Sequence, residues 1–175
     1  MNIKVKKNLV LTGMMGVGKS TVGKILSKKL GFNFIDIDKI IEKKEKNSIN
    51  SIFKIKGESY FRKLETEITL RKLKQDNAVI SLGGGAFLDK TIRKNVKMSA
   101  ISFWLDVNTQ ELVRRLKNSK RRPLLHNKNL TKTINEIYLK RKKTYIMADF
   151  RIKCSFLKTE KIIDTILELY EKSRN

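Results

Sequence analysis

A glycine-rich segment near the N-terminus has the residue types of a polyphosphate-binding loop. Residues 13–20 fit the pattern G-x-x-x-x-G-K-[ST]. In such loops backbone N–H groups cradle phosphates, the lysine reaches the terminal phosphates and the hydroxyl can ligate Mg²⁺. The glycine spacing G-x-x-G-x-G excludes the dinucleotide fingerprint. The segment therefore predicts an ATP site, and the chain is expected to be an ATP-dependent small-molecule kinase. Its residues are Gly13, Met14, Met15, Gly16, Val17, Gly18, Lys19 and Ser20, followed by Thr21.

Carboxylates that could hold a metal ion or accept a proton occur at two places. Asp36 and Asp38 stand at the end of a predicted strand, and residues two apart on a strand project to the same side, with Ile37 on the other. Beside a phosphate-binding loop, this pair could hold Mg²⁺ and accept a hydroxyl proton, although two solvated turn residues are the alternative. Asp106 competes for the metal because it ends the apolar run 101–105. The residues alone leave that choice open.

Three consecutive glycines and three arginines could contact a small acceptor molecule. Gly83–Gly85 follow a predicted strand directly, at the sheet edge where ligands of parallel sheets bind. A flexible loop is the alternative interpretation. Most basic residues are lysines, so Arg62, Arg122 and Arg141 invite an explanation by the planar guanidinium, which matches carboxylates and phosphates. Taken singly, each arginine is more typical of a solvated surface cation, and Arg141, which lies within a basic run, especially so.

Composition limits the other possibilities. The net charge is +23, from 40 Lys+Arg against 17 Asp+Glu, but the lysines are spread along the whole chain. A compositional bias explains this better than a specific nucleic-acid site, because charge alone predicts partners poorly. The single Cys154 excludes an internal disulfide and is expected to be buried, and the single His126 excludes a histidine-rich metal centre. Without a long apolar run, we expect no membrane association and a cytoplasmic protein.

Short apolar runs alternating with amphipathic ones predict the elements that position these residues. Gly31 is expected to end the first helix, and Gly57 to separate two later ones. The alternation predicts one α/β domain over 1–175, with a parallel sheet covered by helices on both faces. Strands are predicted at 9–12, 34–38, 78–82, 100–105 and 150–154, and helices at 22–30, 39–46, 48–55, 61–68, 109–117, 131–147 and 160–172.

Six segments together resemble one enzyme family. They read GMMGVGKSTVGK, FIDIDKIIE, FKIKGESYFRKLE, SLGGGAF, RRPLL and YLKRKKTY, and they run in order from about residue 8 to 145. This combination is similar to shikimate kinase, whereas gluconate kinase and the nucleotide kinases share the loop but lack the combination of FIDID, GESYFR and GGG. A kinase for another small polyol acid, such as gluconate, is the alternative, and a nucleic-acid-binding P-loop protein is a weaker one. The resemblance implies a three-layer α/β/α kinase fold, with five parallel strands in the order 2-3-1-4-5 and a mobile lid over 118–129. It also implies Mg²⁺-dependent transfer of the ATP γ-phosphate to the 3-hydroxyl of shikimate, on the route to chorismate and the aromatic amino acids, and we expect a monomer.

The resemblance also assigns roles to individual residues. It implies that Asp36 supports the metal, which favours Asp36 over Asp106. In the nucleotide site, Lys19 contacts the phosphates, Ser20 ligates Mg²⁺, Arg115 packs against adenine, and Arg122 comes from the lid to neutralise the transferring phosphoryl group. In the acceptor site, Asp38 binds the ring hydroxyls and acts as base, Arg62 and Arg141 grip the carboxylate, and Gly84 and Gly85, next to Gly83, contact the ring through their backbone.

Overall fold

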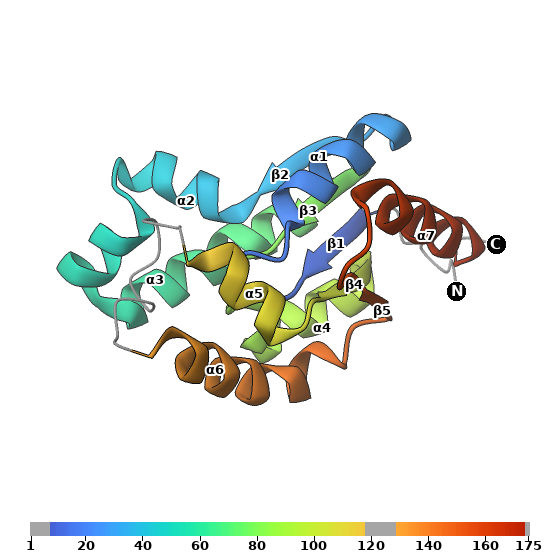
Figure 1. The fold of residues 1–175 in the computed structure, drawn as a ribbon. Helices are drawn as coiled ribbons and strands as arrows, with labels where there is room; N and C mark the ends of the chain where they lie inside the picture. Colours follow the sequence, from blue (N-terminus) through green and yellow to red (C-terminus); the bar gives the residue numbers. More distant parts are fainter. Residues whose placement is uncertain (1–7, 118–128, 174–175) are drawn as a thin grey trace.

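A five-stranded parallel sheet forms the centre of the computed structural model, which describes residues 8–117 and 129–173 (Figure 1). The strands lie in the order β2-β3-β1-β4-β5, as predicted. The register places Val10 of the middle strand opposite Ile80 on one side and Ser102 on the other. The strands are β1 (Asn8–Thr12), β2 (Asn33–Asp36), β3 (Ala78–Ser81), β4 (Ala100–Asp106) and β5 (Phe150–Lys153).

The three inner strands are buried along their whole length, whereas the edge strands β2 and β5 are partly exposed. Parallel strands covered on both faces are expected to read as nearly continuous apolar runs, and β4 does so from Ala100 to Leu105, with Ser102 as its one polar residue. Its aromatic residues Phe103 and Trp104 are among the largest fully buried side chains. The core therefore fixes the sheet rigidly beneath the loops that leave its carboxyl edge.

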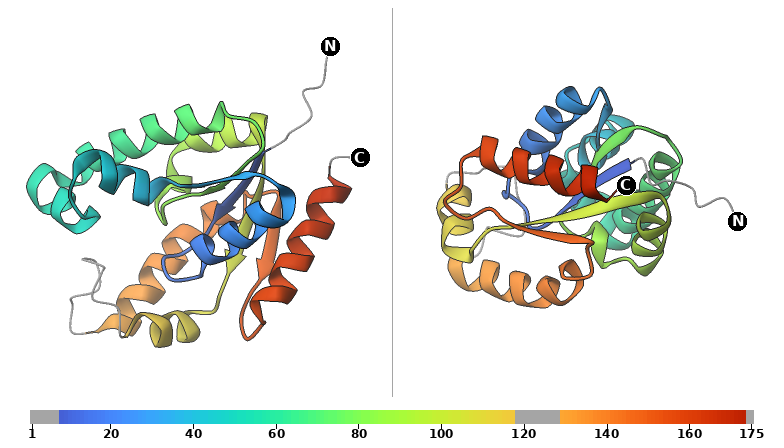
Figure 2. Two further views of the ribbon diagram at one scale, coloured as in Figure 1. Left: turned by 90° about the horizontal axis from the view of Figure 1, so that it is seen from above. Right: turned by 90° about the vertical axis from the view of Figure 1, so that its right-hand side faces the viewer.

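Helices cover both faces of this sheet, which confirms the predicted three layers (Figure 2). Helix α1 packs with α7 on one face, while α3, α4 and α6 gather around the short helix η1 on the other. No helix in the described ranges is long and apolar enough to cross a membrane. The helices are α1 (Lys19–Leu30), α2 (Ile37–Glu45), α3 (Ile49–Leu73), η1 (Ala86–Leu88), α4 (Lys90–Ser99), α5 (Thr109–Leu116), α6 (Leu130–Tyr145) and α7 (Thr159–Lys172).

The strand predicted at 34–38 is shorter than expected. It ends at Asp36, and α2 begins at Ile37. The Asp36 side chain caps this helix by accepting a hydrogen bond from the backbone N–H of Lys39, at 3.3 Å. The prediction that Asp36 and Asp38 project to the same side of a strand is therefore wrong, because Asp38 lies in the first turn of a helix.

The break predicted at Gly57 is present, but the two helices around it follow each other without a connecting loop. They form the two parts of α3, and Gly57 between them has φ 80° and ψ 166°. This backbone conformation is essentially restricted to glycine. Gly31 also behaves as predicted, since it ends α1 in the left-handed conformation with φ 66°.

Sequence reasoning missed α4. The signals were a capping aspartate and two apolar residues at helical spacing: Asp89 accepts hydrogen bonds from two backbone N–H groups of the first turn, and Ile92 and Val96 are buried. The predicted lid over 118–129, with Arg122, lies outside the described residues except for Asn129, which caps α6. The lid and the single domain over 1–175 stay predictions.

Candidate active site

The loop from residue 13 to 18 connects β1 to α1 at the carboxyl edge of the sheet, where the strand order reverses around β1. Ligands of open parallel sheets bind at this point. Gly13 has φ 136°, and a Cβ atom there would lie 2.5 Å from the carbonyl oxygen of Leu105. Gly18, with φ 102°, leads directly into the N-terminus of α1. A helix N-terminus behind a glycine loop is an anion-binding site.

Two side chains predicted to bind the phosphates and the metal are held by short contacts. Lys19 is buried, and its Nζ atom donates hydrogen bonds to the carbonyl oxygens of Gly13 and Met14, both at 2.9 Å. Ser20 Oγ donates to Asp36 Oδ2 at 2.6 Å. The loop and the capping residue of α2 are thus joined, although 16 residues separate them in the sequence.

The other residues predicted to bind ATP occupy different environments. Met14, Met15 and Val17 are buried under the loop, whereas Thr21 is exposed. Arg115, from α5, donates a hydrogen bond to the carbonyl oxygen of Val17 at 3.2 Å and is paired with the buried Glu111. Arg115 therefore lies against the phosphate-binding loop, and these two contacts hold it there.

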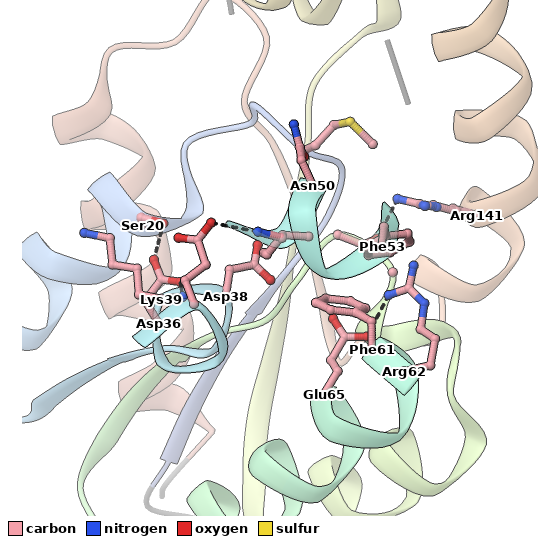
Figure 3. A pocket seen from close by; sticks show the side chains of 15 residues that line it. Ser20, Asp36, Asp38, Lys39, Asn50, Phe53, Phe61, Arg62, Glu65 and Arg141 are labelled. Atoms are coloured by element: carbon pink, nitrogen blue, oxygen red, sulfur yellow. Dashed lines mark hydrogen bonds and ion pairs between the residues drawn. The ribbon is translucent and has the colours of Figure 1, made fainter. Parts of the chain in front are cut away.

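A cavity of about 250 Å³ opens beside the loop and contains most of the predicted acceptor-binding side chains. Figure 3 shows the carboxylates of Asp36 and Asp38 on one side of it and the guanidinium groups of Arg62 and Arg141 on the other. Phe53 lies near the two arginines. The cavity therefore presents hydrogen-bond acceptors at one end and a pair of positive charges at the other.

The two arginines come from different helices and are each held in place. Arg62, in α3, donates to Glu58 at 3.1–3.2 Å and to Glu65 at 2.7 Å. Arg141, in α6, is buried and donates to the carbonyl oxygen of Gly84 at 2.9 Å. Two guanidinium groups that converge in this way can bind one planar carboxylate, and anchoring reduces the entropy lost on binding.

The three glycines after β3 make room for these side chains. A Cβ atom at Gly85 would lie 2.7 Å from both terminal nitrogens of Arg62, and one at Gly83 would lie 2.7 Å from Asp38 Oδ1. At Gly84, a Cβ would lie 3.3 Å from a terminal nitrogen of Arg141. The glycine run therefore allows the side chains of the site to pack against the loop, and Gly84 and Gly85 line the cavity.

Glu65 is a member of the site that sequence reasoning missed. It is 1% exposed, and one of its oxygens accepts the hydrogen bond from Arg62. Within the described residues, its other oxygen, Oε1, has no hydrogen-bond partner. Burial raises the pKa of Glu65 to about 7; the charge of Arg62 opposes this increase, and that of Asp38 adds to it. Its position three residues after Arg62, on the same face of a helix, was the available signal.

Asp106, the competing metal ligand, is engaged elsewhere. It accepts hydrogen bonds from Arg151 at 2.6 and 2.9 Å and from Tyr138 at 2.9 Å. Asp36 instead lies beside Ser20 in the cavity, so the geometry favours Asp36. Cys154 is buried as expected, and burial raises the pKa of its thiol to about 12, which makes it a poor nucleophile at neutral pH.

Comparisons with known proteins identify relatives along nearly the whole chain. The family model for shikimate kinase matches residues 15–171. A shikimate kinase of Persephonella marina is 45% identical over 161 residues, which cover 92% of this chain and 97% of the relative. One of Thermodesulfovibrio yellowstonii is 39% identical over 169 residues, which cover 97% of this chain and 98% of the relative.

Solved structures of similar fold include further shikimate kinases. The shikimate kinase from Acinetobacter baumannii in complex with shikimate has a TM-score of 0.91 and 30% identity, covering 95% of this chain and 93% of that one. The Aquifex aeolicus enzyme has a TM-score of 0.80 and 36% identity, covering 94% of this chain and 96% of that one. A gluconokinase from Sinorhizobium meliloti, at 14% identity and a TM-score of 0.57 with 97% and 94% covered, shares the fold alone. The predicted ATP-dependent kinase is confirmed, and the chain belongs to the shikimate kinase family.

Proposed function

We propose that this site transfers the γ-phosphate of ATP to the 3-hydroxyl of shikimate, giving shikimate 3-phosphate and ADP. The observation that carries the proposal is the arrangement of the cavity, which joins a phosphate-binding loop to two carboxylates at one end and two arginines at the other. Shikimate is a small ring that carries hydroxyl groups and one carboxylate, so it matches both ends. A relative of closely similar fold was solved with shikimate bound.

At the nucleotide end, the loop backbone and the N-terminus of α1 would bind the phosphates of ATP. Lys19 would exchange its hydrogen bonds to loop carbonyls for contacts with the terminal phosphates. Ser20 and Asp36 offer a hydroxyl and a carboxylate 2.6 Å apart, which are the hard oxygen ligands that suit Mg²⁺. When bound there, Mg²⁺ would neutralise charge on the phosphates.

At the acceptor end, Arg62 and Arg141 would bind the carboxylate of shikimate and so direct the ring hydroxyls towards Asp38. Asp38 would accept the proton of the 3-hydroxyl while the 3-hydroxyl oxygen forms a bond to the γ-phosphorus. The bond between the γ-phosphorus and the bridging oxygen breaks at the same time, and that oxygen leaves as part of ADP. The proton ends on the Asp38 carboxylate, and the phosphoryl charge is divided between the product and ADP. Catalysis of this kind depends mainly on positioning and charge neutralisation.

Three further assignments belong to the same proposal. Arg122 would neutralise the transferring group from the lid, and Arg115, which is anchored to the loop, would pack against adenine. We also propose that the enzyme is a cytoplasmic monomer. Its product would enter the route to chorismate.

The test is a coupled assay for ADP with ATP, Mg²⁺ and either shikimate or gluconate. We expect turnover with shikimate, and Asp38→Asn should lower kcat by about 10²- to 10⁴-fold because the base is lost. Asp76→Asn, at an exposed aspartate outside the cavity, is the matched control and should leave kcat unchanged. Turnover of gluconate alone would refute the choice of acceptor, and full activity of Asp38→Asn would refute the assignment of the base.

A further inference from the structure

The acceptor cavity is built from both parts of α3, which meet at Gly57. Ile49, Asn50 and Phe53 line the cavity from the first part, residues 49–56, which we call the cap segment. Phe61 and Arg62 line it from the second part, residues 58–73. The angle between the two parts therefore sets how far the cap segment lies from the arginine that faces the acceptor (Figure 3).

Gly57 itself does not fix this angle. Among the described residues, no heavy atom lies within 4 Å of the position that a Cβ atom would take there. Its positive φ ends one helical part and starts the next. Contacts elsewhere must therefore hold the cap segment.

On the cavity side, the two parts touch through aromatic rings. The rings of Phe53 and Phe61 have centroids 4.7 Å apart, and the guanidinium of Arg62 lies 5.8 Å from the centroid of Phe53. All three residues line the cavity, so these contacts are formed by the same surfaces that an acceptor would touch.

A second set of contacts holds the parts together outside the cavity. Glu45, the last residue of α2, accepts a hydrogen bond from Lys56 Nζ at 2.6 Å and one from Tyr60 Oη at 2.9 Å. Lys56 Nζ also donates to Tyr60 Oη at 3.3 Å and lies 4.6 Å from the centroid of its ring. Lys56 precedes Gly57 and Tyr60 follows it, so one carboxylate bridges the break.

We propose that Glu45, Lys56 and Tyr60 are positioning residues that set the affinity of the acceptor site by holding the cap segment at its angle to the rest of α3. None of the three is among the described residues that line the cavity, so their effect passes through the cap-segment residues that do, Ile49, Asn50 and Phe53. Without them the cap segment samples more orientations, and binding must then select one of them at a cost in affinity. The proposal rests on the proposed function, since it takes shikimate as the acceptor.

The test measures the KM values for shikimate and for ATP in the variants Tyr60→Phe and Glu45→Gln. We expect the KM for shikimate to rise by about two- to fivefold, which is the change in affinity that the loss of an exposed charged contact produces. The KM for ATP and kcat should stay within experimental error of the wild-type values. Titration calorimetry with shikimate alone should show the same loss of affinity. In the pair Tyr60→Phe and Lys56→Met, the double variant should lose less than the product of the single losses, because both act through Glu45.

The matched control is Glu168→Gln, in α7. Its carboxylate accepts a hydrogen bond from Lys172 Nζ at 2.6 Å, the same distance as in the Glu45 pair, but remote from the cavity. This variant should leave both KM values unchanged. If the wild-type protein turns over shikimate and Tyr60→Phe and Glu45→Gln retain its KM, the inference is wrong while the proposed function stands. An equal rise in the KM for ATP would also overturn it. A wild-type protein inactive on shikimate would refute the proposed function itself.

Discussion

Glu65 is a carboxylate that packing forces into an unusual state. It lies beneath Arg62 and beside Gly83, with one oxygen bonded to the arginine and the other without a partner within the described residues. Burial penalises its charge more than a single guanidinium offsets, and the nearby Asp38 adds repulsion. Its hydrogen bond holds the Arg62 guanidinium at the wall of the cavity, where we propose that it binds the acceptor carboxylate.

This state gives the protein a pH-dependent stability. The folded pKa of Glu65, about 7, exceeds its ordinary value of 4.5. A raised pKa contributes stability that is complete below the unfolded pKa and is lost as the pH rises through the folded pKa. We therefore expect the free energy of unfolding to fall between about pH 5 and pH 8 in the wild-type protein. In Glu65→Gln the decline should be much shallower.

Urea denaturation at four pH values between these limits, without ligands, measures both slopes. The exposed Glu67→Gln, two residues along the same helix, serves as control and should keep the wild-type slope. Identical slopes in the wild-type protein and Glu65→Gln would show that another group titrates in this range.

At the scale of elements, the glycine run after β3 matters because of what packs on it. Gly85 has φ −108° and ψ −12°, a backbone conformation that any residue can adopt. A side chain is excluded there because it would collide with the guanidinium of Arg62, and backbone strain plays no part. Gly31 is the opposite case: a Cβ there meets no described atom within 4 Å, but φ is 66°. Gly85 is therefore required because a side chain would collide with Arg62, whereas Gly31 is required because of its backbone conformation.

We expect Gly85→Ala to displace the Arg62 guanidinium and to raise the KM for shikimate at least about tenfold, with little change in the melting temperature, because a partly exposed side chain can move. Gly31→Ala should do the reverse: it should cost about 1 kcal/mol of stability and leave the KM unchanged. Steady-state kinetics and thermal melts on both variants provide the comparison. A loss of stability in Gly85→Ala without a change in KM would contradict the steric explanation.

Local signals predicted most of the elements, and the failures occurred where tertiary contacts decide. The loop at 13–20 and the helix end at Gly31 carry their own chemistry, so they could be located from the sequence. The strand at 34–38 was extended too far because Asp36 caps a helix, which an alternating pattern cannot reveal. Glu65 was missed because its burial depends on Gly83, which lies 18 residues away and on another element.

For the whole molecule, the excess of positive charge is a property that the fold must tolerate. The chain carries 40 basic and 17 acidic residues, so most cations cannot be neutralised by acidic partners. Like charges spread over a small surface repel one another and destabilise the compact state. The ion pairs on the surface, such as Lys29 with Asp164, are exposed and contribute little.

Salt should therefore stabilise this protein. Raising NaCl from about 0.05 M to 0.5 M shortens the Debye length from roughly 14 Å to 4 Å and screens the repulsion more than it weakens the few attractive pairs. We expect the melting temperature to rise by several degrees over this range. Chloride is preferred to sulfate for this measurement, because sulfate could bind at the phosphate-binding loop. A falling melting temperature would mean that attractive pairs dominate.

Trp104 gives the molecule an optical reporter of its own active site. It is the only tryptophan in the chain, it is 1% exposed, and its ring centroid lies 5.8 Å from that of Tyr145, whose hydroxyl donates to the carbonyl oxygen of Gly84. A Cβ atom on Gly13 would lie 3.4 Å from its indole, so the chromophore is also adjacent to the phosphate-binding loop. Tryptophan fluorescence therefore comes from a single point beside the phosphate-binding loop and Gly84, and we expect it to respond when a ligand occupies the neighbouring cavity, without an attached label.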